Sequence, residues 1–201
     1  FNVRLLETVS GVGMLCATEV LLGHYGGWGG VVCGSLPYIP EVLNKMWVWG
    51  QAPDPFAMWL MERGLKTLDV RVRRQNDNTT RIAHWCAERK EIRKVHFPGL
   101  PEHPDHEIAR AMLDGFGSMM AIELVGGGKA TDKFLRKLKL IQHAASLGGV
   151  DSLICEPRYT SHAAMSSDER ARIGIPDGFL RISVGIEDAD DIIADIEPAL
   201  K

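Results

Sequence analysis

Residues 179–188 read FLRISVGIED, and this stretch decides how the C-terminal part of the chain must fold. Apolar side chains alternate with other residues from Leu180 to Ile186, which is the period of a strand with one buried face. Gly185 allows the chain to turn, and Asp188 stands where an N-cap residue would begin a helix with acidic residues in its first turn. The stretch therefore predicts one buried strand that leads into one helix.

Arg181 falls on the other face of this predicted strand. A planar guanidinium held on a rigid strand is well suited to a bidentate grip on a carboxylate. The alternative is a structural ion pair with an acidic neighbour, and such pairs are the commoner explanation for a pattern of this kind. The residues by themselves leave both roles open.

The composition is that of an ordinary globular protein, with 201 residues, 45% hydrophobic residues, 24% charged residues and a formal net charge of -3. This balance does not indicate binding to nucleic acid or to an anionic membrane. No apolar run reaches the roughly 18 residues of a membrane span, and the first residues lack a signal-peptide pattern. We expect a cytoplasmic protein with free thiols, because four cysteines stand far apart: Cys16, Cys33, Cys86 and Cys155.

Several blocks of the chain resemble the Cys/Met-metabolism (transsulfuration) enzymes that depend on pyridoxal phosphate (PLP), a family that includes cystathionine gamma-synthase, cystathionine gamma-lyase and methionine gamma-lyase. The blocks are LRISVGIEDADDIIADIEPAL at 180–200, DPFAMWLMERGLKTLDVRV at 54–72, VHFPGLPEHPDHEIA at 95–109 and GFGSMMAIELVGG at 115–127. In the family, the arginine of the first block binds the α-carboxylate of the amino-acid substrate. The resemblance therefore favours substrate binding by Arg181.

The resemblance covers essentially the whole chain, but only the C-terminal half of the family's subunit. It implies a fold of class α/β and α+β in three parts. Residues 1–54 would be the end of a PLP fold-type I large domain and residues 55–88 a long linking helix. Residues 89–201 would form a small α+β domain with a mainly antiparallel sheet of four or five strands and helices on one side.

The residues of the linking segment support one long helix. Asp54 is an N-cap candidate, and Pro55 suits the first helical position because its missing N–H is not needed there. The apolar period then continues to about Cys86. Gly64 inside this helix would cost about 1 kcal/mol relative to alanine, so close backbone packing is expected there.

Other local signals place elements on both sides of the linking helix. We expect a short strand at 31–33 and a helix at 42–49, whose Trp47 and Trp49 would be buried against a neighbouring subunit or domain. Further on, strands are expected at 92–97 and 118–125. Two caps are expected in the same domain, one from Thr131 and one from the capping box of Ser166 and Glu169.

The segment after residue 15 is where the resemblance breaks down. The family has Ser-x-Thr-Lys, then Gly-His and Ser- or Gly-Asp, and its lysine forms the internal aldimine with PLP. An ungapped alignment places Cys16-Ala17-Thr18-Glu19 on the first motif and Gly23-His24-Tyr25-Gly26 on the rest. A carboxylate cannot form a Schiff base, so Glu19 cannot take the role of that lysine. Cys16 replaces the serine that contacts the cofactor phosphate, and Thr18 is kept.

A second functional signature is the stretch SLGGVDSL at 146–153, which resembles the family loop that faces the substrate. Ser146 matches the family's serine that helps to hold the carboxylate. Asp151 stands where the family usually has glutamate. A cluster of three histidines elsewhere, at 96, 103 and 106, lacks the fixed spacing of a metal site and is broken by three prolines. We therefore expect surface histidines and no metal.

These observations predict one part of a transsulfuration-type assembly that carries out elimination or replacement at Cβ or Cγ of a sulfur-containing or activated-homoserine amino acid. Arg181 and Ser146 would bind the substrate, while Thr18 and Cys16 would be weak cofactor contacts. PLP would be held in the assembly but not covalently by this chain, which alone would be inactive. The partner would be a paralogous or N-terminal-half PLP subunit in a homo- or hetero-oligomer.

Two alternatives remain open on the residues. The chain can be a catalytically inactive subunit that scaffolds or regulates an active paralogue. Glu19 can instead act as a general acid or base without any aldimine.

Overall fold

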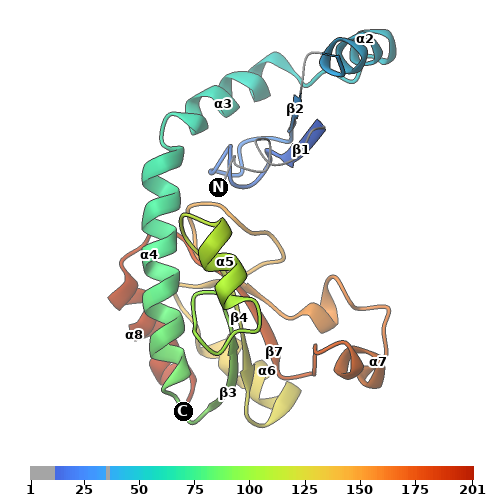
Figure 1. The fold of residues 1–201 in the computed structure, drawn as a ribbon. Helices are drawn as coiled ribbons and strands as arrows, with labels where there is room; N and C mark the ends of the chain where they lie inside the picture. Colours follow the sequence, from blue (N-terminus) through green and yellow to red (C-terminus); the bar gives the residue numbers. More distant parts are fainter. Residues whose placement is uncertain (1–11, 35–36) are drawn as a thin grey trace. The chain divides into compact units, whose positions relative to one another are not determined.

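The computed structural model describes residues 12–34 and 37–201. The chain separates into two compact units, Phe1–Val70 and Arg71–Lys201 (Figure 1). None of the helices in the described part of the chain is long and apolar enough to cross a membrane.

The N-terminal unit contains an antiparallel pair of strands followed by helices. β1 (Val12–Cys16) pairs with β2 (Gly30–Gly34), which confirms the strand expected at 31–33. The helix expected at 42–49 is also present, as α2 (Ile39–Trp49), and α3 (Pro55–Leu65) follows it. A small core forms from four buried residues: Ala17, Leu21, Leu22 and Met61.

The prediction of one continuous linking helix is wrong. α3 ends at Leu65, and α4 (Leu68–Ala87) begins after two intervening residues. The predicted start of α3 is confirmed, because the Asp54 carboxylate accepts hydrogen bonds from two amides of the first turn.

Hydrogen bonds at the end of α3 explain the interruption. The Lys66 amide bonds to the Gly64 carbonyl, and Thr67 places both its amide (3.2 Å) and its hydroxyl (3.2 Å) on the same carbonyl oxygen. These short-range bonds tighten the last turn into the 3₁₀ type. The regular helix ends at this turn, and α3 stops at Leu65.

Gly64 packs closely against the main chain of its own unit, as expected from its place in the helix. A Cβ at this position would lie 2.3 Å from the carbonyl oxygen of Leu22 and 2.9 Å from that of Leu21. Both obstacles are backbone atoms, which cannot rotate aside as a flexible side chain can. An added methyl group would therefore force α3 away from the segment before it.

We predict that Gly64→Ala destabilises the N-terminal unit by about 1–3 kcal/mol, even though alanine favours helix by about 1 kcal/mol. Hydrogen exchange of the α3 amides in the full chain measures this effect. Gly30→Ala is the matched control, because its added Cβ would meet its nearest atom at an ordinary 3.6 Å. Equal protection of α3 in the two variants would contradict the close packing.

The C-terminal unit is built on a five-stranded sheet with the order β3-β4-β7-β6-β5. All neighbouring strands are antiparallel except β5 and β6. This arrangement confirms the small, mainly antiparallel sheet expected for the domain. The strands are β3 (Ile92–His96), β4 (Met119–Leu124), β5 (Gln142–His143), β6 (Leu153–Cys155) and β7 (Phe179–Ser183).

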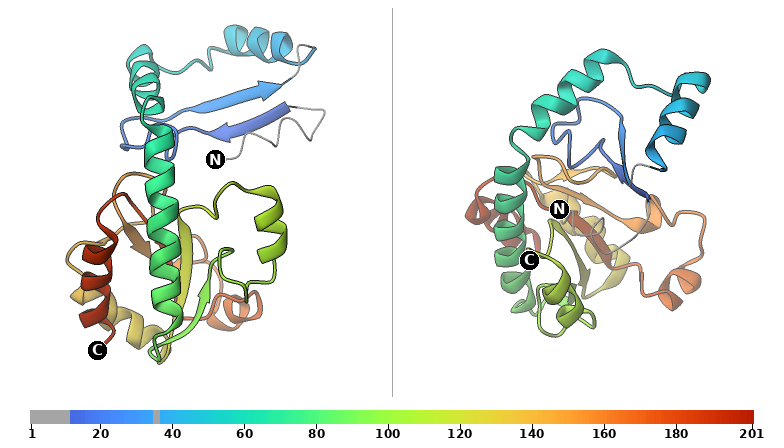
Figure 2. Two further views of the ribbon diagram at one scale, coloured as in Figure 1. Left: turned by 60° about the vertical axis from the view of Figure 1, so that its left-hand side comes forward. Right: turned by 45° about the horizontal axis from the view of Figure 1, so that its top comes forward.

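The core of this unit lies between one face of the sheet and three helices. α4, α6 (Gly127–Lys137) and α8 (Ala189–Ala199) contribute buried side chains to one cluster with the strands. Figure 2 shows α4 and α8 running along the same side of the sheet. The remaining elements are α5 (His106–Met112), the 3₁₀ turn η1 (Pro157–Tyr159) and α7 (Ser167–Arg172).

Most predicted helix starts in this unit are confirmed, with one exception. The carboxylate of Asp188 caps α8, and Ser166 and Glu169 form the capping box of α7. Thr131 is not a cap: α6 already begins after Gly126, whose left-handed φ of 100° turns the chain into the helix early. Thr131 lies inside α6, where its hydroxyl is buried and engaged in the interior.

Candidate functional site

Arg181 lies on β7, the middle strand of the sheet, on the face opposite to the core. Its neighbours Leu180 and Ile182 are completely buried in the core, so the alternation of the strand turns Arg181 to the other face. Ala121 of β4 and Cys155 of β6 stand opposite it on the adjacent strands. Because both side chains are small, there is room over the strand for the long guanidinium.

The guanidinium of Arg181 is held by main chain. Its Nη2 donates hydrogen bonds to the carbonyl oxygens of Ala145 (2.6 Å) and Ser146 (2.9 Å). Its Nε is buried and has no hydrogen-bond partner among the residues that the structure describes. The structural ion pair with an acidic neighbour is therefore not what holds Arg181. Its positive charge remains available to an anionic ligand.

The structure brings Ser146 and Arg181 together. The Ser146 carbonyl contacts the guanidinium, and the residue itself is exposed. Asp151 of the same loop is also exposed, whereas Gly148, Gly149 and Ser152 are buried. One edge of the loop thus faces solvent beside Arg181, and the other edge is packed into the unit.

Residues that the sequence analysis missed hold the buried edge of this loop. Gln75 and Asn78 of α4 are each only 2% exposed. The Gln75 side-chain amide donates to the Gly149 carbonyl at 2.7 Å, and that of Asn78 donates to the Gly185 carbonyl at 3.1 Å. Their spacing of three residues, which places both on one helix face, was a signal that could have identified them.

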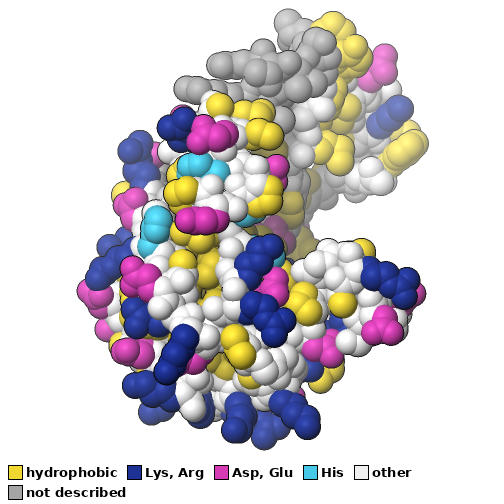
Figure 3. Space-filling model, turned by 60° about the horizontal axis from the view of Figure 1, so that its bottom comes forward, with side chains coloured by type: hydrophobic (Ala, Val, Ile, Leu, Met, Phe, Trp, Pro, Cys, Tyr) yellow, Lys and Arg dark blue, Asp and Glu magenta, His cyan; other side chains and the backbone are white. Residues whose placement is uncertain are grey.

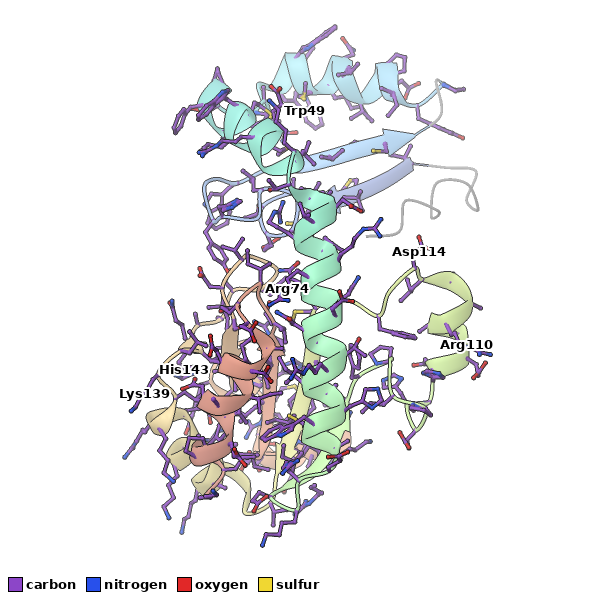
Figure 4. All side chains as sticks on the ribbon, turned by 90° about the vertical axis from the view of Figure 1, so that its left-hand side faces the viewer. Trp49, Arg74, Arg110, Asp114, Lys139 and His143 are labelled. Carbon is purple, nitrogen blue, oxygen red and sulfur yellow. The ribbon has the colours of Figure 1, made fainter. Side chains whose placement is uncertain are left out.

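The exposed side of α4 makes a further contact with the segment after β7. Arg74, labelled in Figure 4, donates through Nη2 to the carbonyl oxygen of Glu187 and to the carboxylate of Asp188, both at 3.3 Å. Asp188 has a pKa below its ordinary value, first because its carboxylate accepts the Asp190 amide and then because Arg74 lies beside it. The start of α8 is therefore tied to α4.

Three other predicted site residues lie together in the N-terminal unit. The Cys16 thiol donates a hydrogen bond to the Glu19 carboxylate at 2.7 Å. The Thr18 hydroxyl accepts the Gly29 amide at 3.1 Å and so joins this segment to the start of β2. The side chains expected to contact cofactor are therefore engaged with one another and with their own loop.

A hollow of about 770 Å³ opens beside Cys16 in this unit, and its walls are mainly apolar. Lys45 of α2 lines it, although Lys45 is far from Cys16 in the sequence. Glu19, which the sequence analysis expects at the family's Schiff-base position, carries a carboxylate that accepts a hydrogen bond from the Cys16 thiol. These residues do not fit covalent attachment of PLP at that position, because an aldimine requires an amine.

The three clustered histidines, His96, His103 and His106, contact protein groups, and His103 accepts the Asp105 amide at 3.2 Å. His96 is 2.6 Å from a carboxylate oxygen of Glu123, and His106 contacts the Pro98 carbonyl at 2.8 Å. Figure 3 shows histidine side chains reaching the surface on one face. Within residues 12–34 and 37–201, no group of three or more His, Cys, Asp or Glu side chains could hold a metal ion.

The C-terminal unit is thus a five-stranded sheet with helices packed on one face and a main-chain-held arginine on the other. The solved structures that it resembles are PLP-dependent enzymes of fold type I, and the chain corresponds to a C-terminal portion of that fold. Residues 2–201 match the family described as Cys/Met metabolism PLP-dependent enzyme, and the chain belongs to this family. The resemblance seen in the sequence is thereby confirmed.

Individual relatives agree with this assignment. Cystathionine beta-lyase of Coxiella burnetii is 40% identical over 186 residues, which are 92% of this chain and 48% of that protein. Chloroplastic cystathionine gamma-synthase 1 of Arabidopsis thaliana is 38% identical over 92% of this chain and 33% of its own length. The crystal structure of cystathionine gamma synthase from Xanthomonas oryzae pv. oryzae in complex with cystathionine superposes with a TM-score of 0.89 and 38% identity.

The match covers nearly all of this chain but only about half of the solved relative. The Xanthomonas structure covers 94% of this chain, but this chain covers 49% of that structure. The chain therefore spans about half the length of the solved Xanthomonas enzyme. It spans about a third of the length of the Arabidopsis protein.

Proposed function

We propose that this chain forms the substrate-carboxylate side of a transsulfuration-type PLP enzyme assembly, in which another chain or segment supplies the cofactor side. The observation that carries the proposal is the Arg181 guanidinium, which donates to two carbonyls and has no ion pair with an acidic side chain among residues 12–34 and 37–201. Arg181 and Ser146 bind and orient the α-carboxylate of an amino acid. Glu19 leaves the amine of the aldimine to be supplied from elsewhere.

The substrate class follows from the relatives. Their names describe enzymes that make or cleave cystathionine, and one is an O-succinylhomoserine sulfhydrylase. A relative has been solved with cystathionine bound. We infer a sulfur-containing or activated-homoserine amino acid that undergoes elimination or replacement at Cβ or Cγ. L-cystathionine is the natural first probe.

The surface of the N-terminal unit supports a partner. A two-stranded sheet is marginal by itself in water, and β1–β2 has no third strand among the described residues. Large apolar side chains of the same unit are exposed, including Trp28 (86%), Trp47 (72%) and Trp49 (66%). The partner we propose is a paralogous or N-terminal-half PLP subunit that covers these side chains and extends the sheet.

An inactive, regulatory subunit is the second candidate. The contact between Cys16 and Glu19 favours it, because both residues depart from the family motif and satisfy each other. In that case the chain stabilises or regulates an active paralogue, and Arg181 binds no substrate. The two candidates differ in where an amino acid binds and in which chain carries PLP.

We predict that PLP in the native assembly is linked to a chain or segment other than residues 1–201. The absorbance spectrum of the purified assembly should show the band of a protonated aldimine. Reduction with borohydride, followed by peptide mass mapping, should then place the added cofactor mass outside the present sequence. The physical reason is that Glu19 offers no amine at the family's position.

A Lys45→Arg variant is the control for this experiment, because Lys45 lines the hollow beside Cys16. Cofactor mass on the Lys45 peptide, lost in the variant, would overturn the proposal that PLP is linked to another chain or segment. An assembly with neither an absorbance band nor added mass would favour the inactive subunit.

A further inference from the structure

The segment whose carbonyls hold Arg181 is short and anchored at both ends. The Ala144 amide donates to the Ile154 carbonyl at 3.0 Å, which fixes the start of the segment to β6. The Gly148 amide donates to the Ser183 hydroxyl oxygen at 2.8 Å, which fixes its end to β7. Only residues 145–147 lie between these anchors, so the two carbonyls have little freedom to move.

Ser183 is well placed for this task. It is 1% exposed and follows Arg181 by two residues on β7, so both side chains project from the same face of the strand. Its hydroxyl accepts the Gly148 amide, while Arg181 donates to the carbonyls just before Gly148. The same strand therefore carries the guanidinium and the anchor of the loop that holds it.

Gln75 provides a second anchor from α4. Its side-chain amide donates to the Gly149 carbonyl at 2.7 Å, next to the amide that Ser183 binds. Gly148 has a left-handed φ of 73°, which lets the chain turn between the two anchors. The peptide groups 147–148 and 149–150 are thus fixed, the first by a strand and the second by a helix.

The far end of the loop is joined to the segment after β7. Glu187 accepts the Ser152 amide at 2.6 Å and the Ser152 hydroxyl at 2.9 Å. The Gly185 amide donates to the Ser152 hydroxyl oxygen at 2.9 Å, and an added Cβ on Gly185 would lie 2.2 Å from the Val150 carbonyl oxygen. These contacts leave the loop no room to slide along the sheet.

We propose that Ser183 and Gln75 are positioning residues for Arg181: they fix the loop so that its carbonyls occupy Nη2 and leave Nη1 to a ligand carboxylate. This inference rests on the proposed function for the identity of the ligand, but not for the loop geometry. Without the anchors, the carbonyls leave Nη2, and the guanidinium must be ordered at the moment of binding.

The test uses the full chain labelled with ¹⁵N-arginine, in which the Arg181 Nε–Hε signal is assigned by its loss in Arg181→Lys. Ser183→Ala should accelerate solvent exchange of that signal. In the native assembly it should weaken L-cystathionine binding by about five- to tenfold, the usual effect of one lost hydrogen bond. Gln75→Leu should act in the same direction. Thr79→Val is the matched control, because Thr79 is fully buried and its hydroxyl donates to the main-chain carbonyl of Gln75 within α4.

The outcomes separate the two proposals. The positioning role is supported if Ser183→Ala shows faster solvent exchange of the Arg181 Nε–Hε signal and weaker L-cystathionine binding. Both effects should be absent in a Thr79→Val protein of similar melting temperature. If Ser183→Ala matches Thr79→Val in both readouts, the positioning role is wrong. If the wild-type assembly binds no L-cystathionine while Ser183→Ala still accelerates the exchange, the positioning role stands and the proposed function fails.

Discussion

Replacing Arg181 by alanine is expected to weaken the binding of L-cystathionine to the assembly by at least about a hundredfold, while the subunits still assemble. The loss is large because truncating one member of a hydrogen-bonded charge pair removes the attraction and leaves the other charge unpaired. Folding should be largely preserved, because Arg181 projects from the face of the sheet that lies away from the core. Calorimetric titration and gel filtration of the same sample measure the two effects.

Two further variants sharpen this experiment. Arg181→Lys keeps the charge but loses the planar fork, so it should recover binding only in part. Arg110→Ala is the control, because Arg110 belongs to an exposed pair with Glu107 on α5, away from β7 (Figure 4). Unchanged binding in Arg181→Ala would leave the inactive subunit as the better description, since a scaffold needs the fold of this domain but not the guanidinium.

Replacing Arg158 by alanine is expected to lower the free energy of unfolding of the C-terminal unit by about 3–5 kcal/mol. Arg158 contacts the Glu156 carboxylate through Nε at 2.9 Å and Nη2 at 2.5 Å, and Asp132 through Nη2 at 2.7 Å. The Glu156 side chain is only 3% exposed, and that of Arg158 is 12% exposed. Without Arg158, the buried Glu156 carboxylate keeps its hydrogen bond from the Thr131 hydroxyl but loses its positively charged partner.

Denaturant unfolding of the full chain measures this loss. The backbone amide signals of the C-terminal unit report the unfolding of that unit. Arg81→Ala is the control: Arg81 pairs with Asp190 between α4 and α8, but both side chains are more than half exposed, so the change should cost at most about 1 kcal/mol. The double change Arg158→Ala with Glu156→Gln should recover part of the loss, because it removes the buried charge. A cost no larger than that of Arg81→Ala would show that the buried pair does not stabilise the unit.

Much of the fold could be predicted because its signals are local. Caps are read from a few neighbouring residues, and those at Asp54, Ser166 and Asp188 are all present. The alternation in β7 was also sufficient to place Arg181 on the open face. Gly64 was expected to pack closely, and a Cβ there would meet backbone.

The failed predictions concern two threonines whose hydrogen bonds the sequence pattern does not reveal. Thr131 looks like a cap in sequence, but its hydroxyl bonds to Glu156, which lies 25 residues further along the chain. Thr67 gave no sign that it would end a helix, and it does so by placing two donors on one carbonyl. The contact of Thr131 with Glu156 depends on packing that no local pattern contains. The Thr67 bonds are local, but the apolar period of the helix continues past them and does not mark the interruption.

The sequence by itself determined the family, the strand that carries Arg181, and the loss of the aldimine amine at Glu19, because each depends on residue type at a given position. Only the tertiary structure decided how Arg181 is held and why α4 carries buried polar residues. Gln75 and Asn78 would suit a solvent-facing helix surface, but here they are buried against two loops. The physical reason is that buried loop carbonyls need donors, and the fold brings these side chains to them.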